Sequence, residues 1–207
     1  SQAVMTGENA LLMVTTDVLE VSIDLVGGTV VSAKLLDYPV ELEVSEIKVD
    51  LLSRSGPEMF IAQSGLLSRE AAPNHTSNYR ADTMQYTLGE SSEEIRVPLT
   101  WDDGNGIHVT KTFIFKRGQY DITVRHTLSN ESGENWSGSR YDQLQRAVIT
   151  DKDDGGFTNP GRYSFFGIGF YSPDEKFEKV DFDDVASEPY ERSFSGGWLS
   201  MVQHYFF

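Results

Sequence analysis

The stretch EIRVPLTWDDGNGIHVTKTFIFKRGQYDITVRHTLSN, from Glu94 to Asn130, decides the fold class of this 207-residue chain. Apolar and polar residues alternate through three runs of the stretch, a pattern that is typical of half-buried β-strands. The runs are separated by Asp102–Gly106 and Lys116–Gln119, where residues that favour turns gather. Three consecutive strands joined by short turns predict an antiparallel meander.

Each strand of the predicted meander has one apolar face. Pro98 cannot donate a hydrogen bond to a sheet, so its strand is expected at an edge. Lys111 interrupts the apolar face of the second strand. His126 lies on the apolar face of the third strand and is interpreted as a hydrogen-bonded core histidine, whereas His108 lies on a polar face and is expected to be exposed. The apolar faces consist of Ile95, Val97, Leu99 and Trp101; Ile107, Val109, Phe113 and Phe115; and Tyr120, Ile122, Val124 and Leu128.

The same alternation is found nearer the N-terminus. Val18–Leu25 and Thr29–Leu36 both have the period of a strand, and Gly27-Gly28 between them supplies a turn, so a hairpin is predicted. No linker, repeat or low-complexity tract divides the chain, so one domain is predicted over residues 1–207. Polar, turn-rich stretches predict loops over residues 69–79, 130–139 and 151–162.

Helix is expected to be scarce. Asp174–Lys179 is predicted to form a single helical turn, with Ser172 as its capping residue and Pro173 at its first position. The segment from Trp198 fits both helical and strand spacing, and we favour a strand. The pattern as a whole predicts an all-β protein with little helix.

The composition excludes several classes of protein. The formal net charge of −15 argues against binding to nucleic acid, which requires clustered Lys and Arg. The chain has no cysteine, so it has neither disulfides nor thiolate metal ligands. No apolar run approaches the roughly 20 residues of a membrane helix. An acidic, solvated exterior is expected.

Recognised catalytic motifs are missing from the chain, which has no nucleophile elbow, phosphate loop or zinc-binding helix. The stretch Asp151–Arg162 begins like a calcium loop, but Arg162 stands where a bidentate Glu is needed. We therefore expect no catalytic residue, no metal and no cofactor. Aromatic residues are interspersed with glycines over Phe157–Tyr171, which could line a peptide or sugar groove or simply pack into a sandwich.

Five segments resemble, in the same order, the large periplasmic domain of the YidC/Oxa family of bacterial membrane protein insertases. The family's pattern continues beyond the last of these segments, so the chain is expected to be truncated at its C-terminal end relative to the family. The segments are Thr15–Pro39, Met59–Leu66, Lys111–Asn130, Tyr171–Lys179 and Gly196–Phe207.

The resemblance implies a twisted antiparallel β-supersandwich, the fold of galactose mutarotases. It also implies a periplasmic location, with membrane tethering through helices outside this chain in the bacterial inner membrane. Insertase activity resides in those helices, so the domain is expected to be a non-enzymatic scaffold and contact surface. The implied partners are the SecD–SecF and SecYEG subunits of the Sec translocon, and nascent membrane proteins.

In this family the C-terminal part of the domain is associated with SecF contact, which corresponds here to residues 164–207. The resemblance therefore implies partner-binding residues in that region, and for Trp198 and Tyr205 an alternative is that they anchor the tail to the sheet. The residues are Phe165, Tyr171, Pro173, Asp174, Glu175, Lys176, Gly197, Trp198 and Tyr205.

Two other functions remain open at this point. A carbohydrate-binding or mutarotase-like protein would use the same sandwich, and would need a histidine and a carboxylate converging in a cleft. A chaperone-like protein would hold extended substrate segments along an aromatic groove that includes Phe165 and Tyr171.

Overall fold

The computed structural model describes residues 10–41, 44–56, 59–147 and 167–202. The chain forms two compact units, residues 1–147 (unit 1) and residues 148–207 (unit 2), which are treated separately below. The single domain predicted over residues 1–207 stays a prediction. The predicted loop over residues 151–162 lies outside the described residues.

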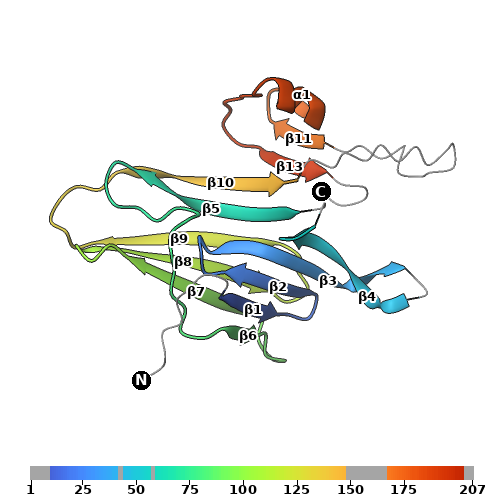
Figure 1. Ribbon diagram of the computed structural model, residues 1–207, viewed down its shortest axis with the longest axis horizontal. Helices are drawn as coiled ribbons and strands as arrows, with labels where there is room; N and C mark the ends of the chain where they lie inside the picture. Colours follow the sequence, from blue (N-terminus) through green and yellow to red (C-terminus); the bar gives the residue numbers. More distant parts are fainter. Residues whose placement is uncertain (1–9, 42–43, 57–58, 148–166, 203–207) are drawn as a thin grey trace. The chain divides into compact units, whose positions relative to one another are not determined.

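Unit 1 contains a seven-stranded sheet in the order β10-β5-β4-β3-β2-β1-β6 (Figure 1). Neighbouring strands pair antiparallel except β1 and β6, which pair parallel. The predicted hairpin around Gly27-Gly28 is confirmed as β2 and β3. The strands are β1 (Leu11–Thr15), β2 (Leu19–Asp24), β3 (Thr29–Glu41), β4 (Val44–Ser53), β5 (Phe60–Ser68), β6 (Gln85–Thr87) and β10 (Gly138–Arg146).

The second sheet of unit 1 is the predicted meander. It consists of β7 (Glu94–Asp102), β8 (Ile107–Lys116) and β9 (Ile122–Asn130), paired antiparallel in chain order. Pro98 lies in β7 at an edge of this sheet, as its missing N–H predicts. The side chain of His108 is 45% exposed and its Nδ1 lies 3.1 Å from Asp102, so its predicted exposure is confirmed.

The two sheets of unit 1 form a sandwich with an apolar interior (Figure 1). The inward faces alternate with polar outward faces, which is why the strand periodicity could be read from the sequence. The interior includes Leu12, Val14, Val21 and Ile23 from the larger sheet and Val97, Leu99, Val109, Phe113 and Phe115 from the smaller sheet. The predicted all-β sandwich is thereby confirmed.

Lys111 is a fully buried cation between the two sheets. Its Nζ donates hydrogen bonds to the carbonyl oxygens of Gly27 and Gly28, both at 2.8 Å, and of Ser64 at 3.1 Å. The ammonium also lies over the ring of Phe113, 5.4 Å from its centroid. Lys111 on β8 of the smaller sheet therefore binds the β2–β3 turn and strand β5 of the larger sheet. The residue that interrupts the apolar face in the sequence is thus a cross-link between the two sheets.

The burial of Lys111 predicts a pH-dependent stability. Burial lowers the pKa of Lys111 to about 7, with Arg140 acting in the same direction and Asp142 against it. Between this pKa and the ordinary value of 10.5, the unfolded chain binds more protons than the folded chain, so stability rises with pH. We expect a gain of about 1 kcal/mol in unfolding free energy from pH 7 to pH 8.

The measurement is urea unfolding at both pH values, compared with the variant Lys111→Met, which lacks the titrating group. The difference between the two proteins isolates Lys111 from other groups that titrate in this range. A difference that stays constant from pH 7 to pH 8 would contradict the lowered pKa.

His126 lies beside Lys111, to which it is paired across strands β9 and β8. Burial first, and then the positive charges of Lys111 and Arg140, lower the pKa of His126 to about 4, so its ring is neutral. Its place on the inward face agrees with the prediction. The predicted hydrogen bond is wrong, because neither ring nitrogen has a partner among the described residues.

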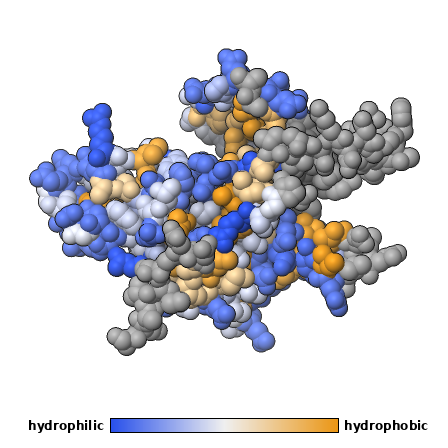
Figure 2. Space-filling model, viewed as in Figure 1, coloured by the Kyte–Doolittle hydropathy of each residue, from blue (hydrophilic) through white to orange (hydrophobic). Residues whose placement is uncertain are grey.

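The β3–β4 hairpin continues past the end of β2 as an arm of unit 1 (Figure 1). Tyr38, Val40 and Ile47 on this arm are 46%, 58% and 60% exposed. Tyr38 contacts Tyr120 edge to face, with ring centroids 5.7 Å apart, and Tyr120 donates a hydrogen bond to Asp37. Polar residues cover much of the face of the molecule shown in Figure 2, and apolar surface gathers at the arm.

Unit 2 contains a three-stranded antiparallel sheet in the order β12-β11-β13. The strands are β11 (Gly167–Ser172), β12 (Lys176–Asp181) and β13 (Trp198–Val202), and the short helix α1 (Phe182–Ser187) follows β12. The strand favoured for the segment from Trp198 is confirmed. In the described part of the chain, no helix has the length and the apolar composition needed to span a bilayer.

Candidate functional site

Seven of the nine predicted partner-binding residues lie in the described part of unit 2. Phe165 and Tyr205 lie outside the described residues. The other seven belong to the three strands or to the turns that lead into β12 and β13, and are Tyr171, Pro173, Asp174, Glu175, Lys176, Gly197 and Trp198.

The segment from Pro173 to Glu175 forms the turn between β11 and β12. The Ser172 hydroxyl accepts a hydrogen bond from the Glu175 N–H at 3.0 Å, and Lys176 Nζ donates to the Pro173 carbonyl at 2.6 Å. The predicted helix over Asp174–Lys179 is therefore wrong. Ser172 does accept a main-chain hydrogen bond, as a capping residue would. The turn that it stabilises belongs to a hairpin, because the residues from Lys176 onward pair with β11 in register.

Three aromatic rings form a continuous surface on one face of this sheet. Tyr171 on the central strand is paired with Phe177 on β12 and with Trp198 on β13. Its ring stacks on Trp198 at 5.7 Å and 14°, and the Trp198 and Phe177 centroids are also 5.7 Å apart. We call Tyr171, Phe177 and Trp198 the aromatic platform.

The arrangement of the aromatic platform requires a residue without a side chain at Gly169 on β11. A Cβ at Gly169 on β11 would lie 3.1 Å from a ring carbon of Phe177 and 2.7 Å from the Ser200 hydroxyl. Because Gly169 has no side chain, the Phe177 ring lies across the central strand towards Trp198. Phe177 is nevertheless 49% exposed and Trp198 45% exposed, so solvent reaches a large part of the platform.

Gly197 sets the start of β13. Its φ is +132°, and a Cβ there would lie 2.2 Å from the Tyr171 carbonyl oxygen and 2.7 Å from a ring carbon of Phe194. A side chain at this position would push β13 away from β11. Gly197 is therefore a positioning residue for Trp198 and has no side chain with which to contact a partner.

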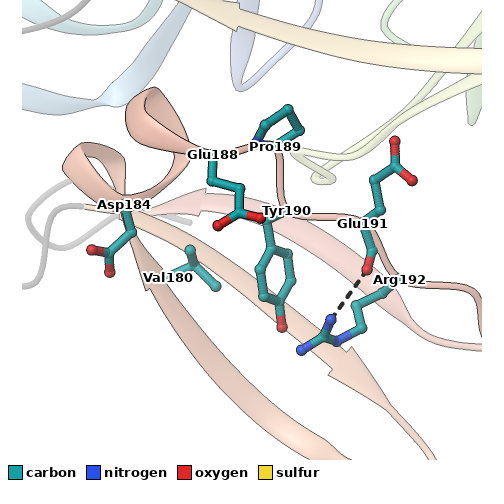
Figure 3. A pocket seen from close by; sticks show the side chains of 7 residues that line it. All are labelled: Val180, Asp184, Glu188, Pro189, Tyr190, Glu191 and Arg192. Carbon is teal, nitrogen blue, oxygen red and sulfur yellow. Dashed lines mark hydrogen bonds between the residues drawn. The ribbon is translucent and has the colours of Figure 1, made fainter.

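The opposite face of the sheet carries a pocket of about 530 Å³ (Figure 3). Arg192 donates to the Glu191 carbonyl at 3.1 Å, and its guanidinium lies 4.3 Å from the centroid of the Tyr190 ring. Figure 3 shows the Asp184 carboxylate at the end of the pocket away from Arg192, and the Glu188 carboxylate beside the Tyr190 side chain. The lining residues are Val180, Asp184, Glu188, Pro189, Tyr190, Glu191 and Arg192.

The sequence reasoning missed this pocket, because five of its seven lining residues come from the loop that follows α1, which has no periodic pattern. It holds no histidine, so it lacks the histidine–carboxylate pair of a mutarotase-like site. Elsewhere in the described chain, His108 pairs with Asp102 in an exposed hairpin and the His75 ring contacts the Tyr141 hydroxyl at 2.6 Å. The described residues also contain no group of three His, Cys, Asp or Glu side chains placed to hold a metal ion.

Comparison with known proteins identifies relatives over almost the whole chain. The family model "YidC periplasmic domain" matches residues 11–207. The membrane protein insertase YidC of Methylococcus capsulatus is 40% identical over 197 residues, which cover 94% of this chain and 35% of the relative. The insertase YidC of Nitrosococcus oceani is 37% identical over 205 residues, covering 98% of this chain and 36% of the relative.

The chain thus spans about a third of the length of the curated relatives it matches. The similarity is not confined to short motifs, since it extends through both units of the structure. On this basis the chain belongs to the YidC periplasmic domain family, the periplasmic part of a membrane protein insertase.

Proposed function

We propose that this domain is a non-enzymatic scaffold and contact surface of an inner-membrane insertase, and that its unit 2 contacts SecD–SecF and SecYEG during membrane protein insertion. The observation that carries the proposal is the aromatic platform. It gathers Tyr171 and Trp198, two residues of the segment associated with partner contact in this family, on one solvent-exposed face. Exposed aromatic residues are enriched at protein–protein contacts.

The electrostatics of the domain also support a contact role. With a net charge of −15, the domain repels acidic macromolecules and attracts basic surfaces. In unit 2, Lys179 lies over the Phe177 ring and Arg192 over the Tyr190 ring, so its aromatic side chains already bind cations within the chain. A partner with exposed Lys or Arg next to apolar groups fits such a surface.

The proposal is tested by photo-crosslinking in the full-length insertase in inner-membrane vesicles that contain the Sec translocon. A photoreactive residue at Phe177 or Trp198 is expected to form adducts with SecD, SecF or a SecYEG subunit. The control places the same residue at Ile47, which is equally apolar and 60% exposed but belongs to unit 1. Adducts of equal yield at Ile47, or none at the platform, would refute the proposed contact surface.

The non-enzymatic part of the proposal has its own test against the mutarotase-like alternative. Calorimetric titration with common aldoses is expected to show no saturable heat, and the domain is expected not to accelerate anomerisation of an aldose. Saturable sugar binding or turnover would establish the alternative function instead.

A further inference from the structure

The three histidines of the described chain differ in what their rings contact. The His75 ring contacts the Tyr141 hydroxyl at 2.6 Å, and the His108 ring lies 3.1 Å from Asp102. Both ring nitrogens of His126, in contrast, are buried in unit 1 without a hydrogen-bond partner. A proton added to the His126 ring would therefore create a cation that has neither a hydrogen-bond acceptor nor contact with solvent, which is a costly arrangement.

Cationic side chains of two other strands lie next to His126. Lys111 on β8 is its cross-strand partner, so the two side chains are neighbours on the inward face of the smaller sheet. Arg140 on β10 reaches β9 and donates to the Val124 carbonyl at 2.8 Å, two positions before His126. Burial, and then the charges of Lys111 and Arg140, lower the pKa of His126 to about 4.

The carboxylate in this group already has a partner. Asp142 on β10 acts on His126 in the opposite sense to the two cations. Its Oδ1 accepts hydrogen bonds from Arg140, at 2.6 Å from Nη2 and at 3.2 Å from Nε. On β9 itself, the neighbours on the inward face are Val124 and Leu128, which carry no charge. Among the described residues the ring thus faces two cations and one carboxylate, and protonation would place three cations around that carboxylate.

The contact between β10 and β9 is the place where this repulsion can be relieved. The side chains of Arg140 and Asp142 are 42% and 61% exposed, so water lies next to them. Arg140 also holds β10 of the larger sheet to β9 of the smaller sheet through its hydrogen bond to Val124. A charge on His126 would repel the donor of that bond, and separation of the two strands would bring water to the ring.

We propose that His126 makes unit 1 acid-sensitive: its protonation breaks the Arg140–Val124 hydrogen bond and separates β10 from β9. The inference goes beyond the proposed function, because it concerns unit 1 and involves no partner. A proton that binds the open form more tightly than the closed form favours opening as the pH falls. With a pKa of about 4 in the closed form and the ordinary value of 6.5 in the open form, opening is favoured about tenfold or more at pH 4.5 relative to pH 6.5.

The test is hydrogen exchange of the 207-residue chain, followed by mass spectrometry at pH 6.5 and at pH 4.5. Exchange is expressed as protection factors, which remove the effect of pH on the intrinsic exchange rate. Peptides from β9 and β10 are expected to lose about tenfold or more in protection at the lower pH. Peptides from β2, which is separated from β10 by three strands of the larger sheet, are expected to lose less.

The variant for this test is His126→Phe, which keeps an aromatic ring but cannot bind a proton. Its β9 and β10 peptides are expected to keep their protection at pH 4.5. The matched control, His108→Phe, makes the same substitution at a side chain that is 45% exposed and is expected to lose protection as the unaltered chain does. Circular dichroism checks that both variants fold.

A second measurement requires no variant. In an NMR titration of the unaltered chain, the His126 ring is expected to stay neutral well below pH 6.5 and to take up its proton together with the loss of protection in β9 and β10. A ring that is protonated near pH 6.5 while both strands stay protected would overturn the inference.

Three results of the exchange experiment would also overturn it. The first is unchanged protection of β9 and β10 at pH 4.5, and the second is an equal loss in His126→Phe. The third is an equal loss in every strand of unit 1, which would show general acid unfolding instead of separation of β10 from β9. Crosslinks from the aromatic platform to Sec subunits test unit 2, so failure of either proposal leaves the other in place.

Discussion

Replacing Lys111 by methionine is expected to lower the free energy of unfolding of unit 1 by about 3 kcal/mol. The side chains have similar length and both are unbranched, so the cavity is small and the loss comes from hydrogen bonding. Methionine leaves three buried carbonyl oxygens, of Gly27, Gly28 and Ser64, without the ammonium that now donates to them. Each unsatisfied buried acceptor costs about 1–3 kcal/mol, and the removal of a buried charge offsets part of the total.

The measurement is urea unfolding followed by tryptophan fluorescence in a Trp198→Phe background, in which the remaining Trp101 and Trp136 both report on unit 1. The matched control is Lys116→Met, which makes the same substitution at the exposed end of the same strand. The control is expected to change stability by less than about 0.5 kcal/mol. Equal losses at the two positions would show that Lys111 does not act as a cross-link between the sheets.

The role of Lys111 also marks a limit of the sequence reasoning. Alternation correctly assigned its neighbours on β8 to the core, because the strand period of two is independent of what each side chain contacts. The partners of Lys111 are main-chain carbonyls separated from it by 84, 83 and 47 positions in the chain. No local sequence pattern indicates these long-range hydrogen bonds. The sequence therefore shows a lysine on an apolar face without showing which groups it binds.

Strands β10 and β1 could not be predicted from periodicity, because their residues do not alternate between apolar and polar. β10 (GSRYDQLQR) is largely exposed at one edge of the seven-stranded sheet, so it lacks the apolar alternation of a half-buried strand. β1 (LLMVT) is almost continuously apolar and gives no clear period. Periodicity thus identified the strands that have one solvent-exposed and one buried face. It failed where the residues on both faces have the same polarity.

The aromatic platform was predictable only in part. The family resemblance points to Tyr171 and Trp198, but the sequence predicts Phe177 in a helical turn and gives no sign of its contact with Trp198. The error came from the Ser172-Pro173 pair, which is a helix-start signal whenever helical residues follow. The residues from Lys176 to Asp181 instead alternate as a strand against β11, and this pairing decided the structure.

Replacing Gly27 by alanine is expected to have the largest effect of a single methyl group in this protein, a loss of about 4 kcal/mol or more of unfolding free energy. The φ of Gly27 is +74°, a conformation in which an L-residue is strained by about 1–2 kcal/mol. A Cβ there would also lie 2.1 Å from the carbonyl oxygen of His75 and 2.8 Å from its Cα. These are main-chain atoms, so they cannot move aside as a flexible side chain could.

The consequence would spread beyond the turn itself. The Gly27 N–H donates to the Ser77 carbonyl at 2.7 Å, and the Gly27 carbonyl accepts one of the hydrogen bonds of Lys111. Moving the β2–β3 turn away from the loop that contains His75 would therefore strain both contacts at once. The effects of Gly27→Ala and Lys111→Met are accordingly expected to be less than additive, because they share this turn.

The control for Gly27→Ala is Gly104→Ala. Gly104 has almost the same φ, +76°, and a Cβ at that position would meet no atom within 4 Å. The control therefore measures the cost of the backbone conformation alone, expected to be about 1 kcal/mol, and the difference between the two variants measures the close approach to His75. Both are followed by urea unfolding in the Trp198→Phe background. If Gly104→Ala destabilises the chain as much as Gly27→Ala does, backbone strain explains both effects and the tight contact between the turn and the His75 loop has no energetic role.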